Sequence, residues 1–182
     1  PPVATSVYDP GQRVNFSASY DVPVYKDTKV TVSAYYSGQS GRPYTLAYFG
    51  DVNGDGRTGN DLLYIPSSAS EVAFTGGSYN DLLTFVQADS CLASYVGKII
   101  PRNACRGPWQ NQLDMRFNMA LPFRRVKAEI TLDILNVINL LDSKGGQMRY
   151  ATFNEIQPVT PVLSSGQVTT YNIAFMTSPT FR

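Results

Sequence analysis

The sequence contains no histidine among its 182 residues. Histidine is the usual general base at neutral pH and the most common metal-binding side chain. Its absence excludes a Ser-His-Asp catalytic triad and every zinc site that uses histidine. No other pair of side chains has the spacing of a nucleophile with its base, or of two catalytic acids. We therefore expect that the protein is not an enzyme.

Charged residues are also scarce. They make up 16% of the chain, and the formal net charge is +1. A protein that binds nucleic acid through the phosphates carries a marked excess of lysine and arginine. This charge balance predicts no nucleic-acid partner.

Long apolar runs are missing as well. A membrane-spanning helix needs about 18 or more consecutive apolar residues. The best stretch, ILNVINLL at Ile134 to Leu141, is short and is interrupted by Asn136 and Asn139. No signal peptide opens the chain, and its first residues are typical of the middle of a longer polypeptide. The length fits one domain of ordinary size.

Cysteine occurs only twice, at Cys91 and Cys105, and neither lies in a CxxC motif. This spacing argues against a zinc site. An isolated pair of cysteines fits a disulfide that closes a loop in an oxidising compartment. The alternative is two buried free thiols, and we favour the disulfide.

The dominant pattern in the chain is strict alternation of apolar and polar residues. It predicts strands with one apolar and one polar face, each near the 9 to 11 residues of a tilted strand that crosses a bilayer. The four clearest runs are VNFSASYDV (14–22), KVTVSAYY (29–36), LDMRFNMAL (113–121) and AEITLDI (128–134). On the last two runs the polar face carries five side chains that we interpret as an ion-pair network, Asp114, Arg116, Glu129, Thr131 and Asp133.

These runs form two similar hairpins with a long excursion between them. In each hairpin the first strand ends at a proline, Pro23 or Pro122, because proline donates no ladder hydrogen bond. The excursion, 37–110, contains both cysteines and a predicted helix that Ser78 begins, with Asp81 in its first turn. Near the end of the chain, GGQMRYATF (145–153) and GQVTTYNIAF (166–175) are predicted strands, and QPVTPVLSSG (157–166) is a predicted turn.

Strands of membrane length, with short turns at one end and long loops at the other, are typical of an outer-membrane barrel. A soluble β-sandwich also alternates, so both architectures stay open on pattern alone. Aromatic residues near the strand ends favour the barrel, since they match the girdles at membrane interfaces. These residues are Tyr20, Tyr25, Tyr35, Tyr36, Phe123 and Tyr150.

The stretch DVNGDGRTGNDL has the oxygen spacing of a calcium loop. Asp51, Asn53 and Asp55 occupy the first, third and fifth positions, and the carbonyl of Arg57 would occupy the seventh. The twelfth position, where an acid is expected, is leucine, and Asp61 lies one residue early. We predict one structural Ca²⁺ held by these five residues. The alternative is a polar turn, which the same residue types favour for backbone reasons.

Four stretches in order resemble one protein family. They are SGQSGRPYT (37–45), DVNGDGRTGNDLLYIP (51–66), PRNACRGPWQNQLDMRF (101–117) and EITLDILNVINLLD (129–142). Together they are similar to the C-terminal barrel region of TonB-dependent outer-membrane receptors, most closely the Oar-like subgroup that carries a carboxypeptidase-regulatory-like domain.

The resemblance implies an all-β, antiparallel transmembrane barrel of 22 strands in the bacterial outer membrane, closed by a plug and energised by the TonB complex. Neither a plug nor a TonB box is recognisable in this sequence. We therefore expect residues 1–182 to be a C-terminal portion of such a barrel, ending before its final strand, with residues 37–110 as an extracellular loop. The turns at Pro23, Pro122 and about Pro158 would be periplasmic.

The expected function is part of a transporter that takes up an unidentified substrate. The expected partners are membrane lipid, the remaining barrel and plug, and the TonB complex through an N-terminal region. Two alternatives stay open. One is an extracellular, calcium-stabilised β-domain used in adhesion or surface assembly, and the other is a structural subunit of a larger membrane complex.

Overall fold

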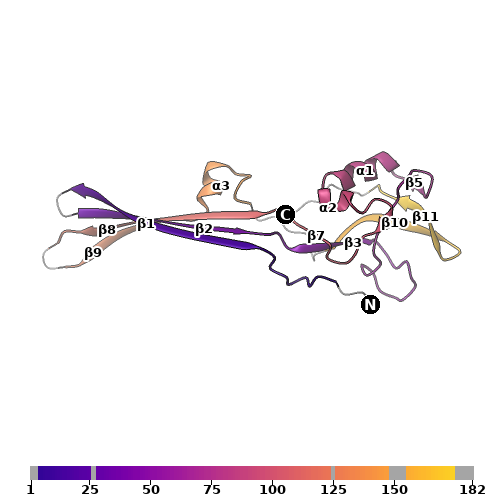
Figure 1. Cartoon of the computed structure of the whole chain (residues 1–182), viewed down its shortest axis with the longest axis horizontal. Coiled ribbons are helices and arrows are strands. Elements are labelled where there is room, and N and C mark those ends of the chain that lie inside the picture. Colours follow the sequence, from indigo (N-terminus) through magenta and orange to yellow (C-terminus); the bar gives the residue numbers. More distant parts are fainter. Residues whose placement is uncertain (1–3, 26–27, 124–125, 148–154, 175–182) are drawn as a thin grey trace. The chain divides into compact units, whose positions relative to one another are not determined.

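The computed structural model describes residues 4–25, 28–123, 126–147 and 155–174, of which 47% lie in β-strands and few in helices. The chain divides into two compact units (Figure 1). The ribbon unit comprises the described residues of Pro10–Gly41 and Pro108–Met148, and the core unit those of Pro1–Asp9, Arg42–Gly107 and Arg149–Arg182. Among the described residues, the strands form three separate sheets, and none of these sheets closes into a barrel.

The ribbon unit is one antiparallel sheet of long strands in the order β1-β2-β8-β9. The strands are β1 (Arg13–Tyr25), β2 (Thr28–Gln39), β8 (Gln110–Leu121) and β9 (Ala128–Ile134). They coincide with the four alternating runs, and both predicted hairpins are confirmed as antiparallel pairs. The central pairing of β2 with β8 joins the two hairpins, with Ala34 opposite Met115.

Of the two prolines predicted to end the first strands of the hairpins, only Pro122 does so. β8 ends at Leu121, directly before Pro122, as predicted. β1 instead runs through Pro23 to Tyr25, and its register shifts between these two residues. Because β1 is an edge strand, an irregular register there accommodates a residue that donates no hydrogen bond.

A short helix, α3 (Val137–Leu141), follows β9 and contacts β8. No helix was expected at these residues. Asn136 precedes the helix in the left-handed conformation (φ 53°), and its side-chain oxygen accepts a hydrogen bond from the Asn139 amide at 3.3 Å. Asparagine tolerates this backbone conformation better than most residues, so one side chain both turns the chain and caps the helix.

The core unit contains the hydrophobic core of the described chain. Its main sheet has the order β5-β11-β10-β3-β7, and β4 pairs with β6 separately. The strands are β3 (Pro43–Tyr48), β4 (Tyr64–Ile65), β5 (Ala73–Thr75), β6 (Lys98–Ile99), β7 (Cys105–Arg106), β10 (Glu155–Ser164) and β11 (Gln167–Asn172). β10 runs parallel to β3, and β11 parallel to β5, so this sheet is mixed and not wholly antiparallel.

Two helices accompany this sheet, α1 (Tyr79–Gln87) and α2 (Ser90–Ala93). The predicted helix start is confirmed, because the Asp81 carboxylate accepts hydrogen bonds from the amide and the hydroxyl of Ser78 at 2.8 and 2.7 Å. The apolar side of α1 buries Leu82, Phe85 and Val86 in the core. Residues 42–107 therefore fold together with β10 and β11 around shared apolar side chains.

The prediction of a turn at 157–166 is wrong, since β10 covers Glu155–Ser164. The turn was predicted because this stretch contains two prolines, which are rare inside strands. Pro158 falls in the register irregularity between Ile156 and Val159, where the ladder to β3 is interrupted and needs no donor. The strand predicted at 166–175 is confirmed as β11. Most of the strand predicted at 145–153 lies outside the described residues.

Candidate functional site

The apolar face of the ribbon sheet is the first candidate for a functional surface. Side chains from all four strands form cross-strand rows on it, such as Tyr20, Val32, Phe117 and Leu132. Many of them stay in contact with solvent: Phe16 is 63% exposed, Tyr20 73%, Ile130 53% and Leu132 55%. A contiguous apolar surface of this kind marks an interaction with another protein or a membrane.

The apolar face is about as long as one tilted strand that crosses a bilayer. On β8 it extends from Leu113 to Leu121, and a strand tilted by about 45° needs about 9–11 residues to cross. The described residues contain no helix of sufficient length and apolarity to cross a membrane.

One end of this face carries two hydrogen-bonded aromatic residues. The Tyr36 hydroxyl and the Trp109 Nε1–H both donate to Asn111 Oδ1, at 2.7 and 3.0 Å. Gly38 makes room for the indole, because a Cβ at this position would lie 3.0 Å from a Trp109 ring carbon. Beyond the other end of β8, Phe123 is exposed. Aromatic residues with a polar tip are enriched where apolar lipid meets water.

The opposite face of the same sheet is polar and cross-linked between strands. Arg116 and Asp133 form an ion pair, with Nε 2.6 Å from Oδ1. The Thr31 hydroxyl donates to Asp21 at 2.8 Å, and the Ser19 and Ser33 hydroxyls lie 2.9 Å apart. The predicted ion-pair network is thus confirmed for Arg116 and Asp133.

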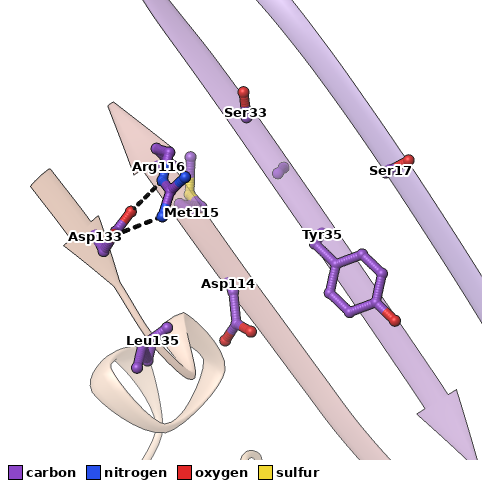
Figure 2. A pocket seen from close by; sticks show the side chains of 9 residues that line it. Ser17, Ser33, Tyr35, Asp114, Met115, Arg116, Asp133 and Leu135 are labelled. Carbon is purple, nitrogen blue, oxygen red and sulfur yellow. Dashed lines mark hydrogen bonds and ion pairs between the residues drawn. The ribbon is translucent and has the colours of Figure 1, made fainter. Parts of the chain in front are cut away.

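A depression of about 370 Å³ lies on this polar face. Figure 2 shows the ion pair on one side of it and the Tyr35 ring on the other, with Leu135 close to the start of α3. Its carboxylates are already engaged: Asp114 accepts the Asn136 amide at 2.8 Å, and Asp133 binds Arg116. Both carboxylates of the depression therefore take part in contacts within the ribbon unit.

The five residues of the predicted calcium loop form a compact polar turn in the core unit. Asp51 accepts the amides of Gly54 at 2.7 Å and Gly56 at 2.8 Å, and both glycines have positive φ. Asp61 accepts the Val52 amide at 2.6 Å. Each carboxylate therefore turns toward the backbone of the loop.

The other members of the predicted calcium set belong to the same turn. Asp55 accepts the Arg57 amide at 2.9 Å, and Asn53 accepts the Asp55 amide at 2.9 Å. Within the described ranges, no group of three or more histidine, cysteine, aspartate or glutamate side chains is placed to hold a metal. The calcium site therefore stays a prediction.

The disulfide prediction is confirmed. Cys91 in α2 and Cys105 in β7 are bonded, with their Cα atoms 5.8 Å apart. Cys105 is buried, and the bond joins a helix to the edge strand of the main sheet of the core unit.

Sequence reasoning overlooked a group of buried tyrosines in the core unit. The Tyr48 and Tyr171 hydroxyls lie 2.6 Å apart, and Tyr171 donates to the Tyr64 carbonyl at 2.8 Å. Tyr44 donates to Asp89 at 2.7 Å. Burial raises the pKa of Tyr44, Tyr48 and Tyr171, so these hydroxyls stay protonated and serve as structural hydrogen-bond donors. Tyr44 and Tyr48 lie in β3, which is buried on both faces and shows no alternation that could have revealed them.

Comparison of the chain with protein-family models, curated proteins and solved structures returned no match. The two-faced sheet of the ribbon unit is therefore the feature of the described chain from which we infer a function.

Proposed function

We propose that this chain is part of a β-barrel transporter of the TonB-dependent type in the bacterial outer membrane, and that it is not an enzyme. One observation carries the proposal: four antiparallel strands of membrane length present an exposed apolar face on one side and a hydrogen-bonded polar face on the other.

The apolar face is the part that would contact lipid. Each square ångström of apolar surface that leaves water contributes about 25 cal/mol. Side chains such as Phe16, Tyr20 and Leu132 therefore favour an apolar surrounding. The aromatic residues Trp109 and Phe123 at the two ends of β8 would then lie near the two membrane interfaces.

The open edges of the sheet support a larger barrel. β1 and β9 are the outer strands in the described sheet order, so each leaves one row of backbone groups unpaired within it. Inside a bilayer every backbone N–H and C=O must be paired, since water is absent there. Further strands of the same barrel would satisfy both edges, and the polar face would then line the lumen and contact a plug.

The core unit would lie outside the membrane. It has its own apolar core and a disulfide, and disulfides persist in oxidising compartments. The resemblance of the four stretches to TonB-dependent receptors gives the proposal its transport function and its partners. The transported substrate is not specified by any group in the described sites.

The same disulfide-bonded core unit favours a second candidate, an extracellular β-domain for adhesion or surface assembly. In that case the apolar face of the ribbon sheet would pack against protein. A structural membrane subunit would share the lipid contact of the leading proposal but would lack a plug in its native polypeptide.

Fractionation of the native protein, followed by mass measurement, separates these candidates. The proposal predicts that the protein sediments with outer membranes, requires detergent for extraction and has the mass of a complete barrel with its plug. A monodisperse protein that stays in solution without detergent would support the extracellular domain instead. A membrane-bound chain too short for a plug would support the structural subunit.

A further inference from the structure

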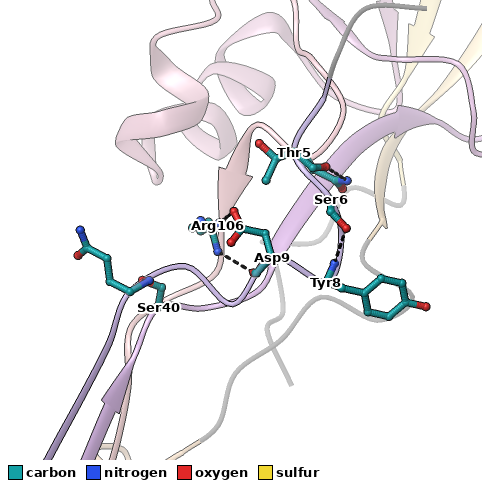
Figure 3. A network of polar contacts seen from close by, with 8 residues as sticks. Thr5, Ser6, Tyr8, Asp9, Ser40 and Arg106 are labelled. Carbon is teal, nitrogen blue, oxygen red and sulfur yellow. Dashed lines mark hydrogen bonds and ion pairs between the residues drawn. The ribbon is translucent and has the colours of Figure 1, made fainter.

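The segment Thr5–Asp9 docks on the core unit without belonging to a helix or strand. The Asn103 side-chain amide donates to the Thr5 carbonyl at 2.6 Å, and Arg106 donates to the Asp9 carbonyl at 3.2 Å. Arg106 also pairs with the Asp9 carboxylate at 2.5 Å. Figure 3 shows Arg106 beside Asp9, with Thr5 and Ser6 farther along the same segment. Asn103 and Arg106 thus hold the two ends of the segment.

The orientation of the Asn103 side chain is fixed by Thr45, independently of the contact with Thr5. Its backbone is left-handed (φ 56°), and its amide N–H donates to Thr45 Oγ1 at 3.0 Å. The Thr45 hydroxyl, which is almost fully buried, donates in turn to Asn103 Oδ1 at 3.0 Å. This reciprocal pair fixes the side-chain amide, so that its N–H₂ group points at the Thr5 carbonyl.

The disulfide lies between the two holding residues in the sequence. Cys105 directly precedes Arg106 and follows Asn103 by two residues, and it is bonded to Cys91. β7 has only two residues, Cys105–Arg106, which pair with Tyr44 and Pro43 of β3. A ladder this short supplies few hydrogen bonds, and its partner Pro43 donates none. The covalent bond therefore constrains β7 together with the Asn103–Thr45 pair and the Gly107 amide, which donates to the Arg42 carbonyl at 3.0 Å.

We propose that Thr5–Asp9 is a strap whose docking depends on the Cys91–Cys105 disulfide. A dithiol reductant would cleave the S–S bond by supplying two electrons and two protons. Both cysteines become thiols, and the reductant becomes its own disulfide. β7 then loosens, and Arg106 no longer holds the Asp9 end of the strap. Since Pro10 follows Asp9 directly, the redox state sets the freedom of the chain that leads into β1.

Hydrogen exchange of the full-length protein, followed by mass spectrometry of the peptide spanning residues 4–9, tests the contact itself. Arg106→Gln and Asn103→Ala each remove a holding group with the disulfide intact. Loss of a hydrogen bond to a charged or fixed partner should raise the exchange rate of the Tyr8 and Asp9 amides about tenfold or more. The matched control is Arg102→Gln, which changes an arginine of the same loop without touching Asn103, Arg106 or the disulfide. It should leave the rate unchanged. Unchanged exchange in both holding variants would overturn the proposal.

The second arm adds dithiothreitol to the wild-type protein, with thiol titration to confirm that both cysteines are free. The proposal predicts a larger rise in the exchange rate of residues 4–9 than of β3 and α1, whose rates should rise only as far as the lower stability of the reduced core unit requires. Full protection of residues 4–9 in the reduced protein would contradict it. Equal loss of protection in β3 and α1 would also contradict it, because the disulfide would then hold the whole unit and not the strap.

Discussion

Arg116 of β8 and Asp133 of β9 lie directly opposite each other on the polar face of the ribbon sheet and share two hydrogen bonds. Nε is 2.6 Å from Oδ1, and Nη2 is 2.9 Å from Oδ2. The register of the β8–β9 hairpin thus places an arginine fork against a carboxylate across the strands. Pairing of this kind favours the observed register, since a slip of β9 by one residue would turn Asp133 to the apolar face, away from Arg116.

The strength of this pair is the first prediction. Both side chains are largely exposed, so solvent screens the pair and its coupling free energy should be small, as for other surface ion pairs. A double-mutant cycle with Arg116→Gln and Asp133→Asn, followed by urea unfolding in detergent, measures it. The Lys29–Asp21 pair, at 3.8 Å, is the comparison and should couple more weakly. Equal coupling free energies in the two pairs would show that the second hydrogen bond between Arg116 and Asp133 adds no stability.

Removal of the disulfide is the second prediction. The bond between Cys91 and Cys105 closes a loop with a sequence separation of 14, for which chain entropy predicts a stabilisation of about 3 kcal/mol. The double variant Cys91→Ser with Cys105→Ser should lower the free energy of unfolding of the core unit by about that amount. Tyrosine fluorescence during guanidinium unfolding reports it. An unchanged midpoint would show that the loop is equally restricted without the bond.

The third prediction concerns pH and the start of α1. Hydrogen bonds from Ser78 lower the pKa of Asp81 below its ordinary value. Because the folded pKa is the lower one, the stabilisation is present in full above the unfolded value of about 3.9 and is lost as the pH falls through the folded pKa. Asp81→Ala should therefore destabilise the core unit at pH 7, and the difference from wild type should shrink in acid. A difference that does not change with pH would mean that the carboxylate charge is irrelevant.

Calcium binding is the fourth prediction. Asp51, Asn53, Asp55, Asp61 and the carbonyl of Arg57 offer about five oxygens, fewer than the six to eight that Ca²⁺ prefers. The structure turns several of these oxygens toward backbone amides. Binding must displace these bonds, so we expect a dissociation constant no tighter than about 10⁻⁴–10⁻³ M. Calorimetry with millimolar Ca²⁺ should show heat that Asp55→Ala abolishes and Asp142→Ala preserves. A flat titration would identify the loop as a polar turn.

The sequence predicts the ribbon unit better than the core unit, and the reason is physical. Each strand of the ribbon has one apolar and one polar face, so the period of two is visible in every run. In the core unit, β3 is buried along its whole length and β4, β6 and β7 have two residues each, so no periodicity can appear. α1 was predictable because Ser78 and Asp81 mark its start. α3 was not, since its cap depends on the unusual conformation of Asn136.

Among the candidate site residues, some were predictable from the sequence and others were not. The disulfide followed from a count of two cysteines, and Arg116 and Asp133 were placed on one face by alternation alone. Their direct pairing was not predictable, because it depends on the register of β8 against β9. The contacts of Asn103 and Arg106 with Thr5 and Asp9 join residues more than ninety positions apart, and local sequence carries no signal for such contacts.

The most direct test of the central proposal compares two neighbouring residues of β8 that lie on opposite faces. With the native indole removed by Trp109→Phe, a tryptophan is placed at the apolar face by Phe117→Trp or at the polar face by Asn118→Trp. Each protein is reconstituted with lipids brominated deep in their acyl chains. The account predicts strong fluorescence quenching at position 117 and little at position 118. Equal quenching at both positions, or none at 117, would contradict a lipid-facing apolar surface.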